Sequence, residues 1–174
     1  MTYLDNQKKD FNSYKVLKKL ISTIQKIELI KPEKAVKEIA YTKYILLPHI
    51  KEIFTEEIKK GLIIRGPINP LKGKFFDGDY LSDISISFKR KPLIGIEVKF
   101  LKSEGRHQSL STAIGQTVIY SLRQYERAIL LIIDEKLNID KDELTMLRKS
   151  LYKNNVTLIY FNFSKNDNQL RFMD

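Results

Sequence analysis

Two carboxylates and a lysine come together in the middle of the chain, in the stretch SDISISFKRKPLIGIEVK. Asp83 begins one segment of alternating residues, and Glu97 and Lys99 lie two apart in the next. Residues two apart in a strand share a face. Two carboxylates can hold a hard cation such as Mg²⁺ or Mn²⁺, and a lysine can orient or deprotonate a water or neutralise a phosphate. The pattern therefore indicates metal-dependent hydrolysis of a phosphodiester bond.

A β-hairpin is the element that we expect to position these groups. The segment 89–92, KRKP, predicts the turn, because proline cannot donate to a strand ladder. An antiparallel register centred near Arg90 would set Asp83 beside Glu97, whereas a slip of one residue would separate them. The sequence alone leaves that register open. The opposite side of the hairpin is apolar and predicts core: Ile84, Ile86, Phe88, Ile94, Ile96, Val98 and Phe100.

A surface hairpin with a cross-strand ion pair is the simpler interpretation of the same charges. The apolar residues around Glu97 and the apolar strands that follow favour a central strand instead. Charged groups at such a position are rare unless they have a function. We therefore expect an active site, with the metal held by Asp83, Glu97 and the backbone carbonyl of Val98.

The length and composition of the chain limit the classes of protein to consider. At 174 residues, we expect a single domain over 1–174, with an N-terminal helical extension over about 1–31. The absence of cysteine excludes disulfides and thiolate metal sites. No apolar run is long enough to span a bilayer, and the N-terminus lacks the apolar core of a signal peptide. These features are typical of a soluble cytoplasmic protein.

The charge balance favours a polyanionic partner. Lys and Arg number 31 against 21 Asp and Glu, which gives a net charge of +10. Nucleic acid is the expected partner, although a lysine-rich composition alone is equally consistent with genome bias or growth at high temperature. The candidates for phosphate contacts, with a solvated charged surface as the alternative, are Lys89, Arg90, Lys91, Lys102 and Arg106.

The periodicity of the rest of the chain predicts an α/β fold. Helical spacing covers 12–30 and again 33–60, where Pro48 predicts a kink or a fresh start and Gly61 a stop. A short strand at 62–64 and a long loop lead into the hairpin. Further segments predict a helix over 109–125, a buried strand over 128–133, a helix that opens at about 140 and runs to about 153, and a strand over 156–161. We expect a mixed sheet of four or five strands, flanked by helices.

Ser82-Asp83 followed by Glu97-Val98-Lys99 resembles the PD-(D/E)XK motif of the restriction-endonuclease-like nucleases, with Ser82 in place of the proline. The expected element order is similar to the αβββαβ core of that superfamily. The resemblance implies a Mg²⁺-dependent deoxyribonuclease in which Lys99 assists the attacking water. Many members add a glutamate from the first helix; Glu57 is our choice because it faces the apolar side, and Glu52 and Glu56 are alternatives.

The helix after the hairpin carries a second resemblance. Gln116 and Tyr120 are similar to the QxxxY signature of the RecB-like and phage-exonuclease branches, and they lie one helical turn apart. The resemblance implies that Gln116 helps to position the substrate or the site and that Tyr120 lies nearby. A polar helix flank with a half-buried tyrosine is the alternative interpretation.

Three functions fit these observations. QxxxY favours a nuclease that processes ends or single strands. A Holliday-junction resolvase or restriction-type endonuclease is the alternative within the same class, and a resolvase would act as a homodimer because paired cuts need two sites. A noncatalytic nucleic-acid-binding subunit is the alternative of another class; the complete set of Asp83, Glu97 and Lys99 weighs against it.

Overall fold

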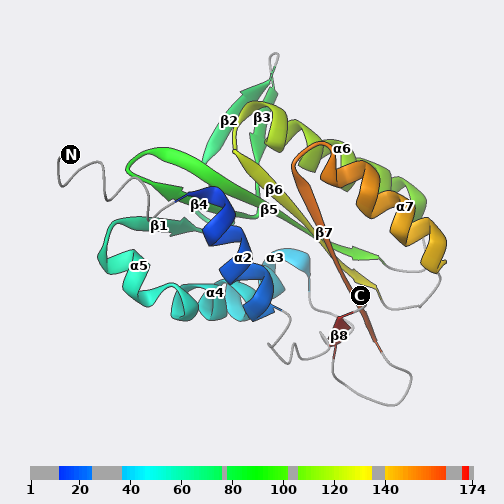
Figure 1. Ribbon diagram of the computed structural model, residues 1–174, viewed down its shortest axis with the longest axis horizontal. Coiled ribbons are helices and arrows are strands. Elements are labelled where there is room, and N and C mark those ends of the chain that lie inside the picture. Colours follow the sequence, from blue (N-terminus) through cyan, green and yellow to red (C-terminus); the bar gives the residue numbers. More distant parts are fainter. Residues whose placement is uncertain are drawn as a thin grey trace.

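A mixed six-stranded sheet lies at the centre of the computed structural model, with strand order β1-β4-β5-β6-β7-β8 (Figure 1). The structure describes residues 12–24, 37–75, 78–101, 106–134, 140–163 and 170–172, and only the backbone at 73–75, 78–79, 106, 162–163 and 170–172. The expected α/β class is confirmed, as is the order of helix, three strands, helix and strand in the main sheet. The sheet has six strands rather than four or five, because β8 (Leu170–Phe172) pairs with β7 as an additional edge strand.

The first half of the sheet is antiparallel. β1 (Leu62–Arg65) pairs with β4 (Ile84–Phe88), which pairs with β5 (Lys91–Leu101). Lys89 and Arg90 both have positive φ, 46° and 70°, as the two residues of a tight hairpin turn require. The turn is therefore shorter than predicted. Pro92 already lies in β5, next to a register shift where its missing N–H is tolerated.

The second half of the sheet is parallel up to its last strand. β5 pairs with β6 (Arg127–Asp134), and β6 pairs with β7 (Val156–Phe163). Parallel strands need crossover connections, which α6 (Arg106–Arg123) and α7 (Lys141–Tyr152) supply. The stretch expected to be a long loop before Asp83 instead contains a separate hairpin of β2 (Lys72–Phe75) and β3 (Gly78–Leu81).

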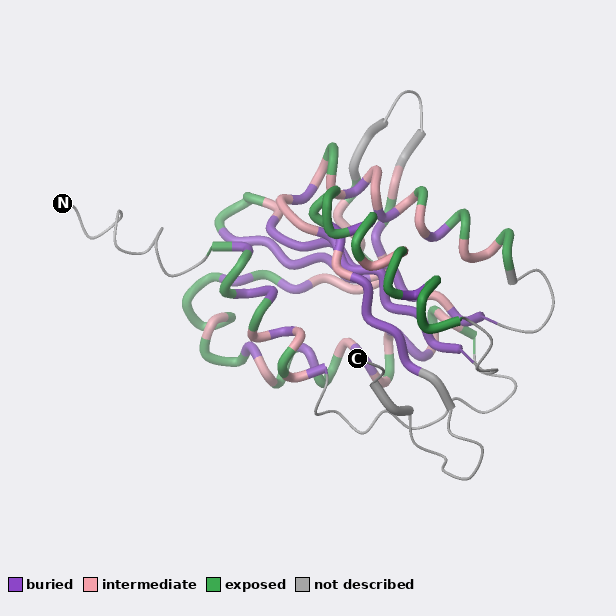
Figure 2. The backbone as a smooth tube through the Cα atoms, turned by 45° about the vertical axis from the view of Figure 1, so that its right-hand side comes forward, coloured by how far each residue is buried: buried purple, intermediate pink, exposed green. Residues whose placement is uncertain are grey.

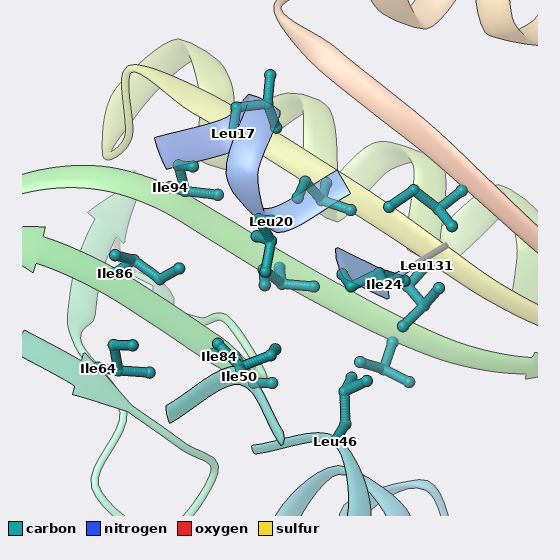
Figure 3. Packing of buried hydrophobic residues seen from close by; sticks show 14 of the residues in the cluster. Leu17, Leu20, Ile24, Leu46, Ile50, Ile64, Ile84, Ile86, Ile94 and Leu131 are labelled. Carbon is teal, nitrogen blue, oxygen red and sulfur yellow. The ribbon is translucent and has the colours of Figure 1, made fainter. Parts of the chain in front are cut away.

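Helices cover both faces of the sheet. α2 (Ser13–Ile24), α3 (Glu38–Tyr41), a π-helical turn η1 (Thr42–Leu46) and α4 (Leu47–Ile53) contribute to the core on one face, and α6 and α7 to the core on the other. Figure 3 shows Leu20, Ile24, Leu46 and Ile50 over the central strands, and Figure 2 shows that the central strands are buried while the outer helix surfaces are exposed. The N-terminal helix is thus part of the core.

The regular α-helix before β1 is interrupted twice. Pro48 lies in the first turn of α4, directly after the π-helical turn η1. Leu46 and Leu47 keep right-handed helical φ and ψ, so the chain continues through this point rather than starting a new helix. A second interruption, a break at Phe54, separates α4 from α5 (Thr55–Lys59). Gly61 follows with φ +102°, a conformation that favours glycine, and ends the helical region as predicted. These breaks change the direction of the helix faces and become important for the candidate site.

Candidate active site

Asp83 and Glu97 lie side by side at the end of the hairpin opposite its turn. Ile84 pairs with Ile96, so the residues that flank this pair, Asp83 and Glu97, face each other across β4 and β5. The register centred near Arg90 is therefore confirmed. Oδ2 of Asp83 accepts a hydrogen bond of 2.8 Å from the backbone N–H of Val98, which fixes its carboxylate next to β5. Glu97 is 7% exposed and Asp83 is half-buried.

Tyr120 of α6 lies against Glu97. Its hydroxyl donates to the carbonyl of Leu81 at 2.8 Å and lies 3.1 Å from Oε2 of Glu97. Burial raises the pKa of Tyr120, and the charge of Glu97 adds to this, so the hydroxyl keeps its proton. The structure therefore places Tyr120 at the site, as expected from the sequence. Gln116 lies one helical turn earlier and is half-buried. Among the hydrogen bonds of the described residues, Tyr120 and not Gln116 is the α6 residue that bonds to Glu97.

Lys99 is held by a glutamate that the sequence analysis did not select. Its Nζ lies 3.0 Å from Oε2 of Glu38, and Oε1 of Glu38 accepts a longer hydrogen bond of 3.3 Å from the backbone N–H of Phe100. Glu38 thus links the first residue of α3 to β5. The lysine and this glutamate are partly buried, with side chains 24% and 33% exposed.

The choice of Glu57 is corrected by this geometry. Glu57 lies on α5 and forms an ion pair with Lys19 of α2, while Glu52 and Glu56 are exposed and lie near His49 and Lys59. The choice of Glu57 rests on regular helical spacing over 33–60, interrupted only at Pro48, and on the helix faces that this spacing predicts. The π-helical turn and the break at Phe54 change those faces. The sequence gives no signal that would distinguish Glu38.

Two further residues shape the wall of the site. Tyr125 lies on Gly95, where a Cβ atom would come within 2.6 Å of the tyrosine ring, so a larger residue two positions before Glu97 would displace it. The Tyr125 hydroxyl and Oγ of Ser82 are 2.7 Å apart. Ser82, at the proline position of the motif, therefore has a structural role beside Asp83.

The carboxylates are buried close to one another, and this changes their acidity. Burial raises the pKa of Asp83 to about 6, and the charge of Glu38 acts in the same direction, while the Val98 N–H and Lys99 oppose it. Burial raises the pKa of Glu97 to about 8, the charge of Asp83 raises it further, and Tyr120 and Lys99 offset part of the shift. Near pH 7 the metal-free site therefore keeps Asp83 largely charged and Glu97 largely protonated.

The donor set fits a hard cation that keeps part of its water shell. Among the residues that the structure describes, no three acidic or histidine side chains are grouped closely enough to hold a metal ion. Two carboxylates, a carbonyl and several waters are nevertheless a usual set for Mg²⁺. Because the N–H and C=O of a strand residue point to the same edge, the Val98 carbonyl faces the side on which its N–H meets Asp83. β4 begins only at Ile84, so no β4 residue pairs with Val98.

An open hollow of about 400 Å³ gives access to this region. It is lined by Lys37, Glu38, Ile39, Asp83 and Phe100. The aromatic ring of Phe100 packs edge-on against Tyr41, with centroids 5.2 Å apart, and closes the inner side. A phosphate group could therefore approach Asp83 from solvent without any rearrangement of the core.

The basic residues predicted to contact phosphates lie in different places. Lys89 and Arg90 are exposed at the hairpin turn, about 20 Å along the strands from Asp83. Lys91 forms an ion pair with Glu126. Lys102 and the side chain of Arg106 lie outside the described residues. The basic turn is thus remote from the carboxylates, and those three residues do not line the site.

Comparisons with known proteins leave the family open. No family model and no curated protein matches the chain. The chain is similar to SfsA of Pyrococcus furiosus, solved in complex with Ca²⁺, with 14% sequence identity and a TM-score of 0.37. The match covers 73% of this chain and 61% of the SfsA chain, so this chain spans less than two thirds of that protein. Within the described part of the chain, no helix has the length and apolar character needed to cross a membrane.

Proposed function

We propose that this protein is a metal-dependent nuclease that hydrolyses phosphodiester bonds, with DNA as the expected substrate. The observation that carries the proposal is the pairing of the half-buried Asp83 with the buried Glu97, with Lys99 on the same strand as Glu97. Burying two carboxylates together is costly unless a function requires it. The resemblance to the PD-(D/E)XK motif supports the same chemistry.

Each side chain has a role that its position suggests. Asp83, Glu97 and the Val98 carbonyl would hold Mg²⁺ or Mn²⁺, which would polarise the phosphate and lower the pKa of a bound water. Lys99 would orient that water or neutralise charge that develops on the phosphate. Glu38 keeps the lysine ammonium at the site through the 3.0 Å ion pair, and Tyr120 orients the Glu97 carboxylate. Gln116 remains a candidate for positioning the substrate.

A junction-resolving or restriction-type endonuclease is the second candidate, and Glu38 favours it. A helix glutamate together with Asp83, Glu97 and Lys99 is the arrangement that we expect of a junction resolvase within this superfamily. QxxxY supports an enzyme acting on ends or single strands, but among the described hydrogen bonds only its tyrosine contacts Glu97. The two candidates share one metal site and differ in substrate.

A panel of nucleic acids tests the proposal and separates the candidates. Duplex, single-stranded and four-way-junction DNA, and RNA, would each be incubated with Mg²⁺, Mn²⁺ or EDTA. We expect metal-dependent cleavage by the wild type and little by Lys99→Ala. Preferred cleavage of junctions would favour the resolvase, and preferred cleavage of single strands the RecB-like enzyme. Binding without cleavage of any substrate would support a noncatalytic subunit and overturn the proposal.

A further inference from the structure

A second hollow, here called the α4 groove, lies between η1 and α4 on one side and the connection after β1 on the other. Its volume is about 490 Å³, and its lining includes Lys43, Lys51 and Arg65 but no acidic residue. Among the described residues, none of these three cations has a carboxylate partner. Lys43 donates to the hydroxyl of Tyr44 and lies over the Tyr44 ring, and neither contact supplies a full negative charge. The lining of the groove is therefore cationic, with Lys51 exposed and Lys43 and Arg65 half-buried.

The helical wall connects the α4 groove to the candidate active site. Ile39 lines the hollow beside Asp83, and Lys43, Leu47 and Lys51 follow at intervals of four residues along the same helical region and line the groove. Twelve helical residues span about 18 Å. This length matches several phosphate steps along a nucleic-acid strand.

The opposite wall is also close to the site. Arg65 is the Cα partner of Ser85, two residues after Asp83, so the guanidinium belongs to the strand next to the proposed metal ligand. Gly66 keeps the floor of the groove tight, because a Cβ atom there would come within 2.5 Å of the Leu47 side chain. The two hollows thus share both a helical region and a sheet edge.

We propose that the nucleic-acid strand acted on at the site continues into the α4 groove, where Lys43, Lys51 and Arg65 hold its phosphates. This inference rests on the proposed nuclease function and extends it. Lysines provide point charges and arginine a planar fork, both suited to phosphate oxygens. An acidic protein segment would meet the same cations, but the continuity with Asp83 favours a phosphodiester chain.

Binding measurements test the groove separately from catalysis. Labelled single-stranded and duplex DNA would be titrated in EDTA over a series of salt concentrations, with the triple variant Lys43→Ala/Lys51→Ala/Arg65→Ala. The control Lys141→Ala/Lys149→Ala/Lys153→Ala removes the same charge from the α7 region, and α7 contributes to the core on the opposite face of the sheet. The groove variant should bind about tenfold more weakly or worse, and its log–log salt slope should fall by about 2 to 3, because each phosphate contact contributes about 0.7 to 0.9. The control should keep the wild-type slope.

Folding and specificity are checked in the same experiment. Single changes such as Lys43→Gln should each reduce the slope by about one, and they keep the proposal testable if the triple variant melts early. Equal loss in both triple variants, an unchanged groove variant, or binding of polyglutamate in place of DNA would overturn the inference. If the wild type cleaves DNA while the groove variant binds normally, only the groove assignment fails. If the wild type binds through the groove but never cleaves, the nuclease proposal fails.

Discussion

The backbone N–H of Val98 donates a 2.8 Å hydrogen bond to Oδ2 of Asp83. Val98 lies between Glu97 and Lys99, so this one bond ties the start of β4 to the strand that carries the other two proposed catalytic groups. It holds the Asp83 carboxylate against the backbone of β5, so this side chain is not free to rotate away from Glu97. The consequences below follow from that fixed proximity.

Glu97→Gln should stabilise the metal-free protein at high pH. Burial raises the pKa of Glu97 to about 8, so the unfolded chain loses this proton at lower pH than the folded protein does. Stability conferred by the protonated group is thus fully present below the unfolded pKa, about 4.5, and declines as pH rises through about 8. The amide removes this loss, and we expect its melting temperature to exceed that of the wild type by about 5–10 °C near pH 9 but by little near pH 5.

Thermal melts in EDTA across this pH range measure the difference. Asp83, with a pKa raised to about 6, adds a smaller decline at lower pH in both proteins. A constant difference between wild type and Glu97→Gln at all pH values would show that Glu97 titrates normally.

Metal binding should release a proton near neutral pH. A cation needs the charged form of Glu97, which is largely protonated below about pH 8 when metal is absent. Calorimetric titration with Mg²⁺ in buffers of different ionisation enthalpy would therefore give binding heats that depend on the buffer near pH 7. This difference between buffers should shrink toward about pH 9. Heats that do not depend on the buffer would contradict this coupling.

Glu38→Gln should impair catalysis, and Glu57→Gln should not. The first change weakens the ion pair that holds Lys99, whereas the second affects the pair with Lys19 on α2. Losing a supporting contact of this kind commonly costs about 10- to 100-fold in activity. Cleavage rates at saturating Mg²⁺ compare the two variants, and a larger loss in Glu57→Gln would restore the original sequence-based choice.

Tyr120→Phe and Gln116→Ala should separate structure from substrate positioning. The phenylalanine leaves the Leu81 carbonyl without its donor, which should cost about 1–3 kcal/mol in the free energy of unfolding and also lower activity. Gln116 is only half-buried, so its truncation should change stability by less than about 0.5 kcal/mol. Urea denaturation measures the free energy of unfolding of each variant, and cleavage assays measure its activity. A Gln116→Ala protein with wild-type activity would remove Gln116 from the site.

The hairpin could be predicted from the sequence because strand alternation is a local property. Apolar residues at every second position placed Asp83 and Glu97 on one face, and the single short turn left few registers. The buried strand over 128–133 followed from its unbroken apolar run. The position of Tyr120 near the hairpin was implied by the resemblance to the QxxxY signature rather than by a local pattern, and α6 brings it there as it crosses from β5 to the parallel strand β6.

Glu38 and the α4 groove could not be predicted in this way. A helical wheel predicts which residues share a face only where the α-helix between them is regular. The π-helical turn η1 and the break at Phe54 interrupt the α-helix between Glu38 and Glu57. Arg65 is brought near Asp83 by β1–β4 pairing, which the sequence does not encode as a local pattern. The basic composition of the turn around Lys89 predicts phosphate contacts there. The length of the hairpin, however, separates this turn from the carboxylates.

Cleavage of labelled DNA by wild type and Glu97→Gln, purified identically and compared in Mg²⁺ and in EDTA, tests the central claim most directly. The substrate would be the one cleaved fastest in the panel. We predict cleavage by the wild type in Mg²⁺ alone, and none by Glu97→Gln above a protein-free control, because the amide cannot supply the charged metal ligand. Equal cleavage by both proteins, or a wild type that cleaves no nucleic acid with either Mg²⁺ or Mn²⁺, would contradict it.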